Sequence, residues 1–156
     1  MSLTFSIVRP DSESASALIH ELDEDLLKRY PGQWIHSLHP EDVINPKVIF
    51  VVGSLNMEPI ACGALRPFEQ GIAEVKRMFV KPAYRGRGYS RQVLSYLEAA
   101  ALKSGYQTLR LETGTEQPEA VGLYRSSGYC TIPCFGEYIG NPFSLCFEKR
   151  LSGEQI

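Results

Sequence analysis

Apolar and polar residues follow one another in patterns that predict a strand, a long helix and a second strand in the first third of the chain. Residues 4–9 alternate polar and apolar side chains, which is typical of a half-buried strand. Over residues 12–30 apolar side chains recur at helical spacing, and a Pro-Gly pair ends the predicted helix. Residues 33–46 are irregular, apart from a short helix start at the Pro-Glu-Asp of this segment, and the apolar run at 48–52 predicts a strand buried on both faces.

The middle of the chain predicts a hairpin and then a crossover from strand to helix to strand. Residues 59–66 and 73–80 are expected to be strands, and the alternation of the second slips at Lys76-Arg77, which indicates a β-bulge. A glycine-rich turn follows at residues 82–88. Apolar positions then predict a helix over residues 89–103, which ends at a glycine.

The last third predicts three more strands and a short helix. Strands are expected at residues 107–113, 129–134 and 144–150, with a helix at 119–127 that begins after Pro118. This order of elements predicts an α/β fold, with a mixed sheet and a strand–helix–strand crossover at its centre.

Composition narrows the class of protein. The chain has 156 residues, which fits one domain. Its 16 basic and 18 acidic residues give a net charge of −2, which argues against a general nucleic-acid binder. No apolar run approaches the ~20 residues that a membrane span needs, and the first residues lack the pattern of a signal peptide, so we expect a cytoplasmic protein.

The cysteines and histidines do not predict a metal site. Cys62, Cys130, Cys134 and Cys146 form no C-x-x-C pair, and the first and last of them lie in apolar runs, where a thiol acts as a small buried apolar group. His36 and His39 lie near prolines without a ligand pattern, which is typical of solvated loop histidines.

The glycine-rich turn is a candidate anion site. It reads Arg85-Gly86-Arg87-Gly88-Tyr89-Ser90 and opens a helix, whose unpaired N–H groups and positive dipole end suit a phosphate or pyrophosphate. It lacks the G-K-[ST] of a P-loop, and Arg91 replaces the third glycine of the dinucleotide fingerprint. A turn that merely connects two elements is an interpretation that stays open on these residues alone.

Two motifs resemble those of the GNAT superfamily of N-acetyltransferases. Val80-Lys81-Pro82 followed by the glycine-rich turn resembles the acyl-CoA-binding motif, with Ser90 where the family usually has Gly or Ala. Residues 117–129 resemble the second signature, N-x-x-A-x-x-L-Y-x-x-x-G-[FY], with Gln117 in place of Asn. The resemblance implies a single domain over residues 1–156 with a mixed, mostly antiparallel sheet, and a transferase that uses acetyl-CoA and no metal.

The resemblance also implies where acetyl-CoA would bind. The backbone of the strand before the turn would hold the pantetheine arm, the turn would hold the pyrophosphate, and the residue at the Asn position would contact the pantetheine or the substrate. These residues are Met78, Phe79, Val80, Arg85, Gly86, Arg87, Gly88, Tyr89, Ser90 and Gln117.

Attack of an amine on a thioester needs a group that takes a proton from the amine and a group that gives one to sulfur. By the resemblance, Tyr124 is the candidate general acid. Glu74 lies eleven residues before Arg85, at the spacing of the general-base glutamate in the histone-acetylating branch of the family. The alternatives are that Tyr124 only packs its helix against the sheet, and that Glu74 is solvated or paired with Lys76.

The acceptor is not identified by the sequence beyond a small molecule or other group that carries a primary amine. Residues 135–142 and the first helical region would wall its site, and the acidic run Glu21, Asp23, Glu24 and Asp25 would suit a cation or be a solvated face. A non-catalytic CoA-binding sensor or partner module is the alternative function, and a nucleotide-phosphate binder is a weaker one. Nucleic acid and membrane are not expected partners, and a homodimer stays open.

Overall fold

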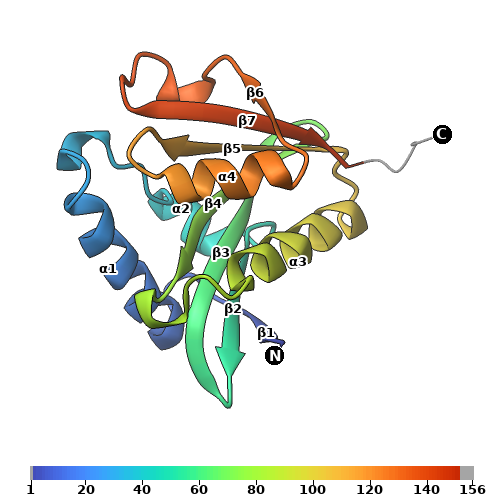
Figure 1. Ribbon diagram of the computed structural model, residues 1–156. Coiled ribbons are helices and arrows are strands. Elements are labelled where there is room, and N and C mark those ends of the chain that lie inside the picture. The colour runs from blue at the N-terminus through green and yellow to red at the C-terminus, as the bar shows by residue number, and fades with distance from the viewer. Residues whose placement is uncertain (1, 152–156) are drawn as a thin grey trace.

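Seven strands form one sheet in the order β1-β2-β3-β4-β5-β7-β6 in the computed structural model, which describes residues 2–151 (Figure 1). Neighbouring strands are antiparallel except β4 and β5, which are parallel. The predicted mixed, mostly antiparallel sheet is therefore confirmed. The strands are β1 (Thr4–Val8), β2 (Ile49–Leu55), β3 (Glu58–Glu69), β4 (Ile72–Val80), β5 (Thr108–Gly114), β6 (Cys130–Ile132) and β7 (Ser144–Arg150).

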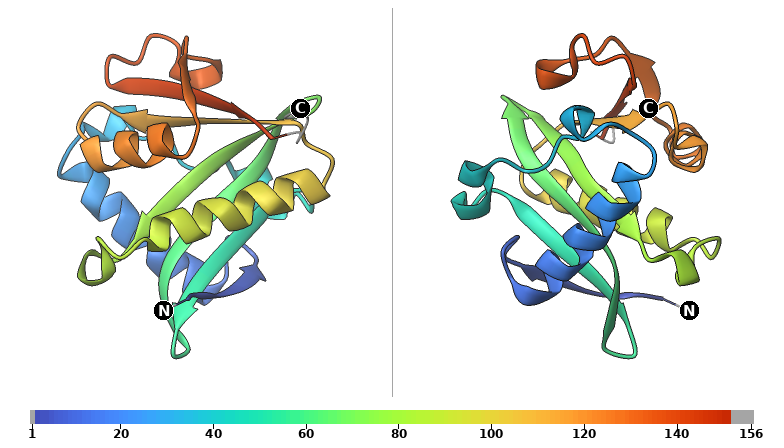
Figure 2. Two further views of the ribbon diagram at one scale, coloured as in Figure 1. Left: turned by 45° about the vertical axis from the view of Figure 1, so that its right-hand side comes forward. Right: turned by 90° about the vertical axis from the view of Figure 1, so that its left-hand side faces the viewer.

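Two long helices cover opposite faces of the sheet. Helix α3 (Tyr89–Lys103) makes the predicted crossover from β4 to β5 and packs on the face that carries Val51, whereas α1 (Glu13–Leu27) packs on the face of Phe50. Figure 2 shows α3 in front of β2, β3 and β4 and α1 behind them. Consecutive strand residues point to opposite faces, so the continuous apolar run of β2 serves both cores. The shorter helices are α2 (Pro40–Ile44) and α4 (Pro118–Ser126).

The sheet opens between β4 and β5. Their parallel pairing runs from Ile72 opposite Thr108 to Val75 opposite Leu111 and then stops, so the two strands diverge beyond these residues (Figure 1). On the other side of β4, the pairing with β3 shifts register, and Arg77 adopts a φ of +59°. The predicted bulge is thus confirmed, and it leaves this part of β4 irregular beside the opening.

Several boundaries differ from the sequence expectation. The first helix ends at Leu27 rather than residue 30, and the strand expected at 129–134 is reduced to Cys130–Ile132. Short 3₁₀ turns at Gly32–Trp34, Pro82–Tyr84 and Gly136–Tyr138 were not predicted. Such single turns leave no periodic pattern for a sequence to display.

The cysteines are free thiols, and Cys62 and Cys146 are buried as expected. None of the helices in the described part of the chain has the length and apolar character that crossing a bilayer requires.

Candidate active site

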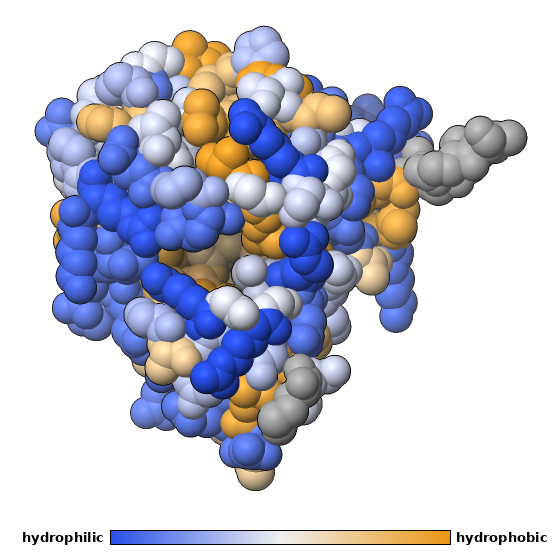
Figure 3. Space-filling model, viewed as in Figure 1, coloured by the Kyte–Doolittle hydropathy of each residue, from blue (hydrophilic) through white to orange (hydrophobic). Residues whose placement is uncertain are grey.

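A cleft of about 450 Å³ lies where β4 and β5 diverge. Its walls come from α1, the segment 34–36, the second half of β4, the turn before α3, the end of β5 and α4. Figure 3 shows a hollow with an apolar floor between α4 and that turn. Most of the residues that the sequence assigned to acetyl-CoA line this one cleft, namely Met78, Phe79, Val80, Arg85, Gly86, Gly88, Tyr89, Ser90 and Gln117.

The glycine-rich turn forms an open cradle at one end of the cleft. Gly86 and Gly88 have φ values of +78° and +83°, which favour glycine, and no atom lies within 4 Å of where a Cβ would stand at either position. No side chain caps α3, so the N–H groups of its first turn are available to an anion. The cradle therefore fits a pyrophosphate. Arg87 does not line the cleft, and its guanidinium lies 5.8 Å from the centre of the Tyr84 ring.

Gln117 lines the cleft, but its side-chain oxygen is engaged within the protein. It accepts hydrogen bonds from the Tyr30 hydroxyl at 3.2 Å and from the Gly114 N–H at 3.3 Å. A Cβ at position 114 would overlap the Tyr30 hydroxyl, so only glycine permits this close approach. Arg29 adds an ion pair with Glu119 at 3.0 Å. Gln117 thus joins the segment that follows α1 to the turn between β5 and α4.

Tyr124 lies on α4 with its side chain against the cleft. It is 5% exposed, and its ring packs against Tyr129 and Phe147 at centroid distances of 5.8 and 6.2 Å. Within residues 2–151 its hydroxyl makes no hydrogen bond. Burial, and to a smaller degree the nearby Glu112 carboxylate, raise the pKa of Tyr124 well above its usual value. The phenol therefore stays protonated and can donate to a ligand in the cleft.

Glu74 is not brought to the cleft. It is 2% exposed, its carboxylate lies 3.1 Å from the Arg66 guanidinium and 3.8 Å from the Lys76 ammonium, and it accepts a hydrogen bond from the Tyr138 hydroxyl. Two cations and a phenol engage its oxygens. This environment argues against Glu74 as the group that takes the proton of an acceptor amine, and agrees with the alternative of a Lys76-paired carboxylate.

Glu112 is a cleft carboxylate that the sequence reasoning missed. It follows Leu111, the last residue of β5 that pairs with β4, and so stands where the strands begin to diverge. Ser144 Oγ donates a hydrogen bond to it at 2.7 Å, and no cation lies at ion-pair distance from it within residues 2–151. Burial raises the pKa of Glu112 to about 7. An acidic residue inside the strand predicted at residues 107–113 was the signal that could have identified it.

Comparison with known proteins agrees with this geometry. The model of the acetyltransferase (GNAT) family matches residues 16–129. The chain belongs to this family.

Several of its relatives match over nearly the full length. It is 36% identical to the IAA acetyltransferase of Azospirillum brasilense over 96% of this chain and 99% of that protein. A candidate acyl-CoA N-acyltransferase of Klebsiella pneumoniae has 33% identity and a TM-score of 0.81, over 96% of this chain and 97% of that one. The PaiA N-acetyltransferase of Thermoplasma acidophilum, solved in complex with coenzyme A, shares the fold with a TM-score of 0.71 at 18% identity, over 94% and 99% of the two chains.

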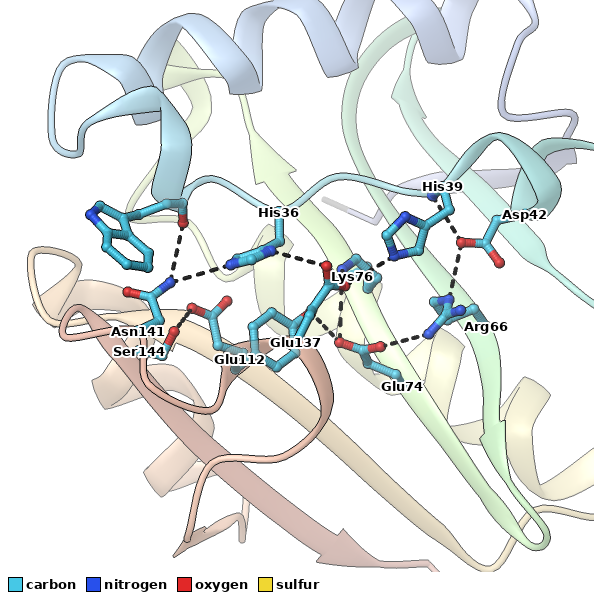
Figure 4. A network of polar contacts seen from close by, with 12 residues as sticks. His36, His39, Asp42, Arg66, Glu74, Lys76, Glu112, Glu137, Asn141 and Ser144 are labelled. Atoms are coloured by element: carbon cyan, nitrogen blue, oxygen red, sulfur yellow. Dashed lines mark hydrogen bonds and ion pairs between the residues drawn. The ribbon is translucent and has the colours of Figure 1, made fainter.

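A polar network in this GNAT chain joins two loops beside the cleft (Figure 4). The Glu137 carboxylate lies 3.1 Å from His36 Nδ1, 3.2 Å from His39 Nε2 and 3.7 Å from Lys76 Nζ. Burial pushes the pKa of Glu137 up, but Lys76 and the two histidines together hold it below its usual value. The expectation of solvated loop histidines is wrong for His36, whose side chain is 17% exposed, whereas the His39 side chain is 43% exposed. Both rings contact a carboxylate about one hundred positions away.

The acidic run of α1 is not simply a solvated face of the GNAT fold either. Asp23 lies 2.6 Å from the Arg77 guanidinium, and Asp25 lies 3.5 Å from that of Arg85. These carboxylates neutralise cations of β4 and of the turn. Within residues 2–151 no group of three or more His, Cys, Asp or Glu side chains is arranged to hold a metal ion.

Proposed function

We propose that this protein, acting as one domain, transfers an acetyl group from acetyl-CoA to a primary amine. The observation that carries the proposal is one cleft with a glycine cradle at its end, a protonated phenol on one wall and a carboxylate of pKa about 7 where β4 and β5 diverge. Two further facts support it. The relative from Azospirillum brasilense is named an acetyltransferase, and the neighbour from Thermoplasma acidophilum binds coenzyme A.

In this proposal the chain holds acetyl-CoA at two places along its length. The backbone N–H groups at Gly86, Gly88 and the first turn of α3 bind the pyrophosphate, and the backbone of residues 78–80 binds the pantetheine arm. Because the bulge at Arg77 removes this part of β4 from regular pairing, a main-chain N–H there can polarise the thioester carbonyl.

The proton transfers are assigned to two side chains. An ammonium proton of the acceptor goes to Glu112, and the freed nitrogen lone pair attacks the thioester carbon. A C–N bond forms and the C–S bond breaks, while the proton of the Tyr124 hydroxyl goes to the departing sulfur. The nitrogen then loses its second proton as the amide forms, and this proton restores the Tyr124 hydroxyl, while Glu112 returns its proton to solvent. The products are the amide and the thiol of coenzyme A.

We assign the base to Glu112 rather than to Glu74. An effective general base has a pKa near the working pH and lies within reach of the proton. Glu112 lines the cleft and has a pKa of about 7, whereas Glu74 does not line it and contacts Arg66 and Lys76. In this proposal Glu74 affects the site indirectly, through its ion pair with Lys76, which lines the cleft.

The test of the function is release of free thiol from acetyl-CoA in the presence of a panel of primary amines, with binding of coenzyme A measured in parallel by calorimetry. We expect thiol release that depends on both protein and amine. Tight binding of coenzyme A without thiol release from any amine would favour the non-catalytic CoA-binding module. Equal binding of ADP and coenzyme A would favour a nucleotide-phosphate binder.

A further inference from the structure

The end of the cleft away from the glycine cradle is lined by aromatic rings. We call this part the aromatic end and define it by Tyr30, Trp34, His36, Tyr138 and Phe143, which come from two stretches of chain about one hundred positions apart. The rings of Tyr30 and Phe143 meet edge to face at 5.6 Å, and those of His36 and Tyr138 at 5.0 Å. Asn141 fixes the two stretches together, because its Nδ2 donates to the Trp34 carbonyl at 3.3 Å.

The basic side chains that line the cleft already have anionic partners. Lys76 lies 3.7 Å from Glu137 and 3.8 Å from Glu74, and it donates to the Tyr138 hydroxyl at 2.7 Å. The remaining pairs are Arg29 with Glu119, His36 with Glu137, Arg77 with Asp23, and Arg85 with Asp25.

Glu112 differs from these charged groups. Among the lining residues of the described chain it alone has a charge without an opposite charge at ion-pair distance, and its partner is the neutral Ser144 hydroxyl (Figure 4). The cleft can therefore offer one carboxylate to a positive group, but it has no unpaired cation for a negative one.

We infer that the acceptor is a primary amine carried on an aromatic body that has no carboxylate. The inference rests on the proposed function and deepens it. The ammonium group of such a molecule would lie at Glu112, and its ring would pack among the rings of Trp34, Tyr138 and Phe143. Offset and edge-to-face ring pairs stabilise such packing, and the ring faces also favour a nearby cation. A carboxylate on the acceptor would lose its water without gaining a cation, which is strongly unfavourable.

Three amines test the inference with wild-type protein and acetyl-CoA: 2-phenylethylamine, L-phenylalanine, which adds a carboxylate to the same frame, and n-butylamine, which lacks the ring. We expect kcat/KM for 2-phenylethylamine to exceed that for L-phenylalanine by at least ~100-fold and that for n-butylamine by roughly 10-fold. Equal or faster turnover of L-phenylalanine or n-butylamine would overturn the inference, while the acetyl transfer itself would stand.

Two substitutions test whether the aromatic ring of the acceptor packs in the aromatic end of the cleft. Phe143→Leu and Trp34→Leu should each raise KM for 2-phenylethylamine by roughly 3- to 10-fold, the contribution of one aromatic contact. The KM for acetyl-CoA and for n-butylamine should change less than ~2-fold. Phe5→Leu is the matched control, because the Phe5 ring stacks on Tyr96 at 4.6 Å outside the cleft lining. Unchanged KM values in both cleft variants would refute the aromatic contact.

A binding measurement separates this inference from the proposed function. Each amine is titrated by calorimetry into the protein saturated with coenzyme A. If no amine releases thiol, the proposed function fails, yet selective binding of 2-phenylethylamine over L-phenylalanine would still support the aromatic end as its site. Absence of that selectivity would overturn the inference whatever the turnover.

Discussion

Glu112→Gln is the most informative single change, because it removes one proton site and keeps the shape of the side chain. Glutamine can still accept the hydrogen bond that Ser144 Oγ donates at 2.7 Å, so the cleft wall should keep its geometry. The variant cannot take a proton from an ammonium group. Two quantities should therefore change in opposite directions, the rate of acetyl transfer and the free energy of unfolding.

The rate effect follows from the raised pKa of Glu112. A carboxyl group with a pKa of about 7 is half ionised at neutral pH, so kcat/KM of the wild type should rise with pH up to about 7 and then level. A general base contributes roughly 10²–10⁴-fold. The variant should be at least ~100-fold slower at pH 8 and should recover as the pH approaches the amine pKa of about 10, where free amine is abundant.

The stability effect has the opposite sign. The folded pKa lies above the ordinary 4.5, so the stability that Glu112 contributes is complete below pH 4.5 and is lost as pH rises through about 7. At about 1.36 kcal/mol per pH unit, this loss is about 3 kcal/mol above pH 7. Glutamine has no such loss, so the variant should be more stable than the wild type at pH 8 and nearly equal to it at pH 4.

The assays are thiol release from acetyl-CoA between pH 6 and 9 and urea unfolding at pH 4 and pH 8. Glu69→Gln is the matched control, since Glu69 is exposed at the end of β3 and does not line the cleft. A pH–rate profile of Glu112→Gln that overlays that of the wild type would remove Glu112 from the mechanism. Equal stability at pH 8 would show that the folded protein does not raise this pKa.

Three further changes test the other parts of the site. Gly88→Asp should weaken coenzyme A binding at least ~10-fold in calorimetry, since it adds a carboxylate at a φ of +83° in the cradle; unchanged affinity would refute the cradle. Tyr124→Phe should lower turnover roughly 100-fold and leave the Kd of acetyl-CoA unchanged, because the phenol proton is needed only as charge builds on sulfur; equal turnover would reduce Tyr124 to packing. Glu74→Gln should move the acid limb of the pH–rate profile to lower pH, because the negative charge of Glu74 raises the pKa of Glu112; an unmoved limb would show that Glu74 does not act on Glu112.

The features that the sequence predicts well are those with a local cause. The amphipathic spacing of α1 and α3, the glycines of the turn and the irregular step at Lys76-Arg77 each depend on residues within a few positions of one another. The turn and its helix follow each other directly, so the candidate phosphate site could be placed from the sequence. The two motifs then placed Tyr124 beside it.

The choice between Glu74 and Glu112 depends on distances that no local pattern encodes. Both residues lie on central strands, and only the point at which the β4–β5 pairing stops decides which of them faces the cleft. That point is set by the packing of the whole sheet. Spacing to the turn favoured Glu74, yet Arg66, eight positions away on β3, pairs with it across the hairpin.

The contacts of Gln117 likewise could not be predicted from a local sequence pattern. Its side chain is longer than that of the Asn usual at this position of the motif, so the contact of that Asn with pantetheine or substrate could not be carried over. In the structure this side chain accepts a hydrogen bond from Tyr30, 87 positions earlier in the chain. A hydrogen bond between such distant residues requires the fold to be known first. The pairing of Glu137 with His36 and His39 has the same origin.

Glu74, which is buried, and Glu112, which is partly buried, have different environments because the Lys76 ammonium lies at ion-pair distance only from the first of them. Its ammonium is held by Glu74, Glu137 and the Tyr138 hydroxyl, so it does not form an ion pair with Glu112 one strand away. If it did, the pKa of Glu112 would fall and the carboxylate would become a weaker base. In the proposed mechanism Glu74 is therefore a positioning residue, since its charge holds Lys76 away from the proposed proton acceptor, Glu112. The pairing of β4 with β5 ends directly before Glu112, and the divergence of the two strands opens the cleft there. Glu112 is thus the carboxylate that we propose takes the proton.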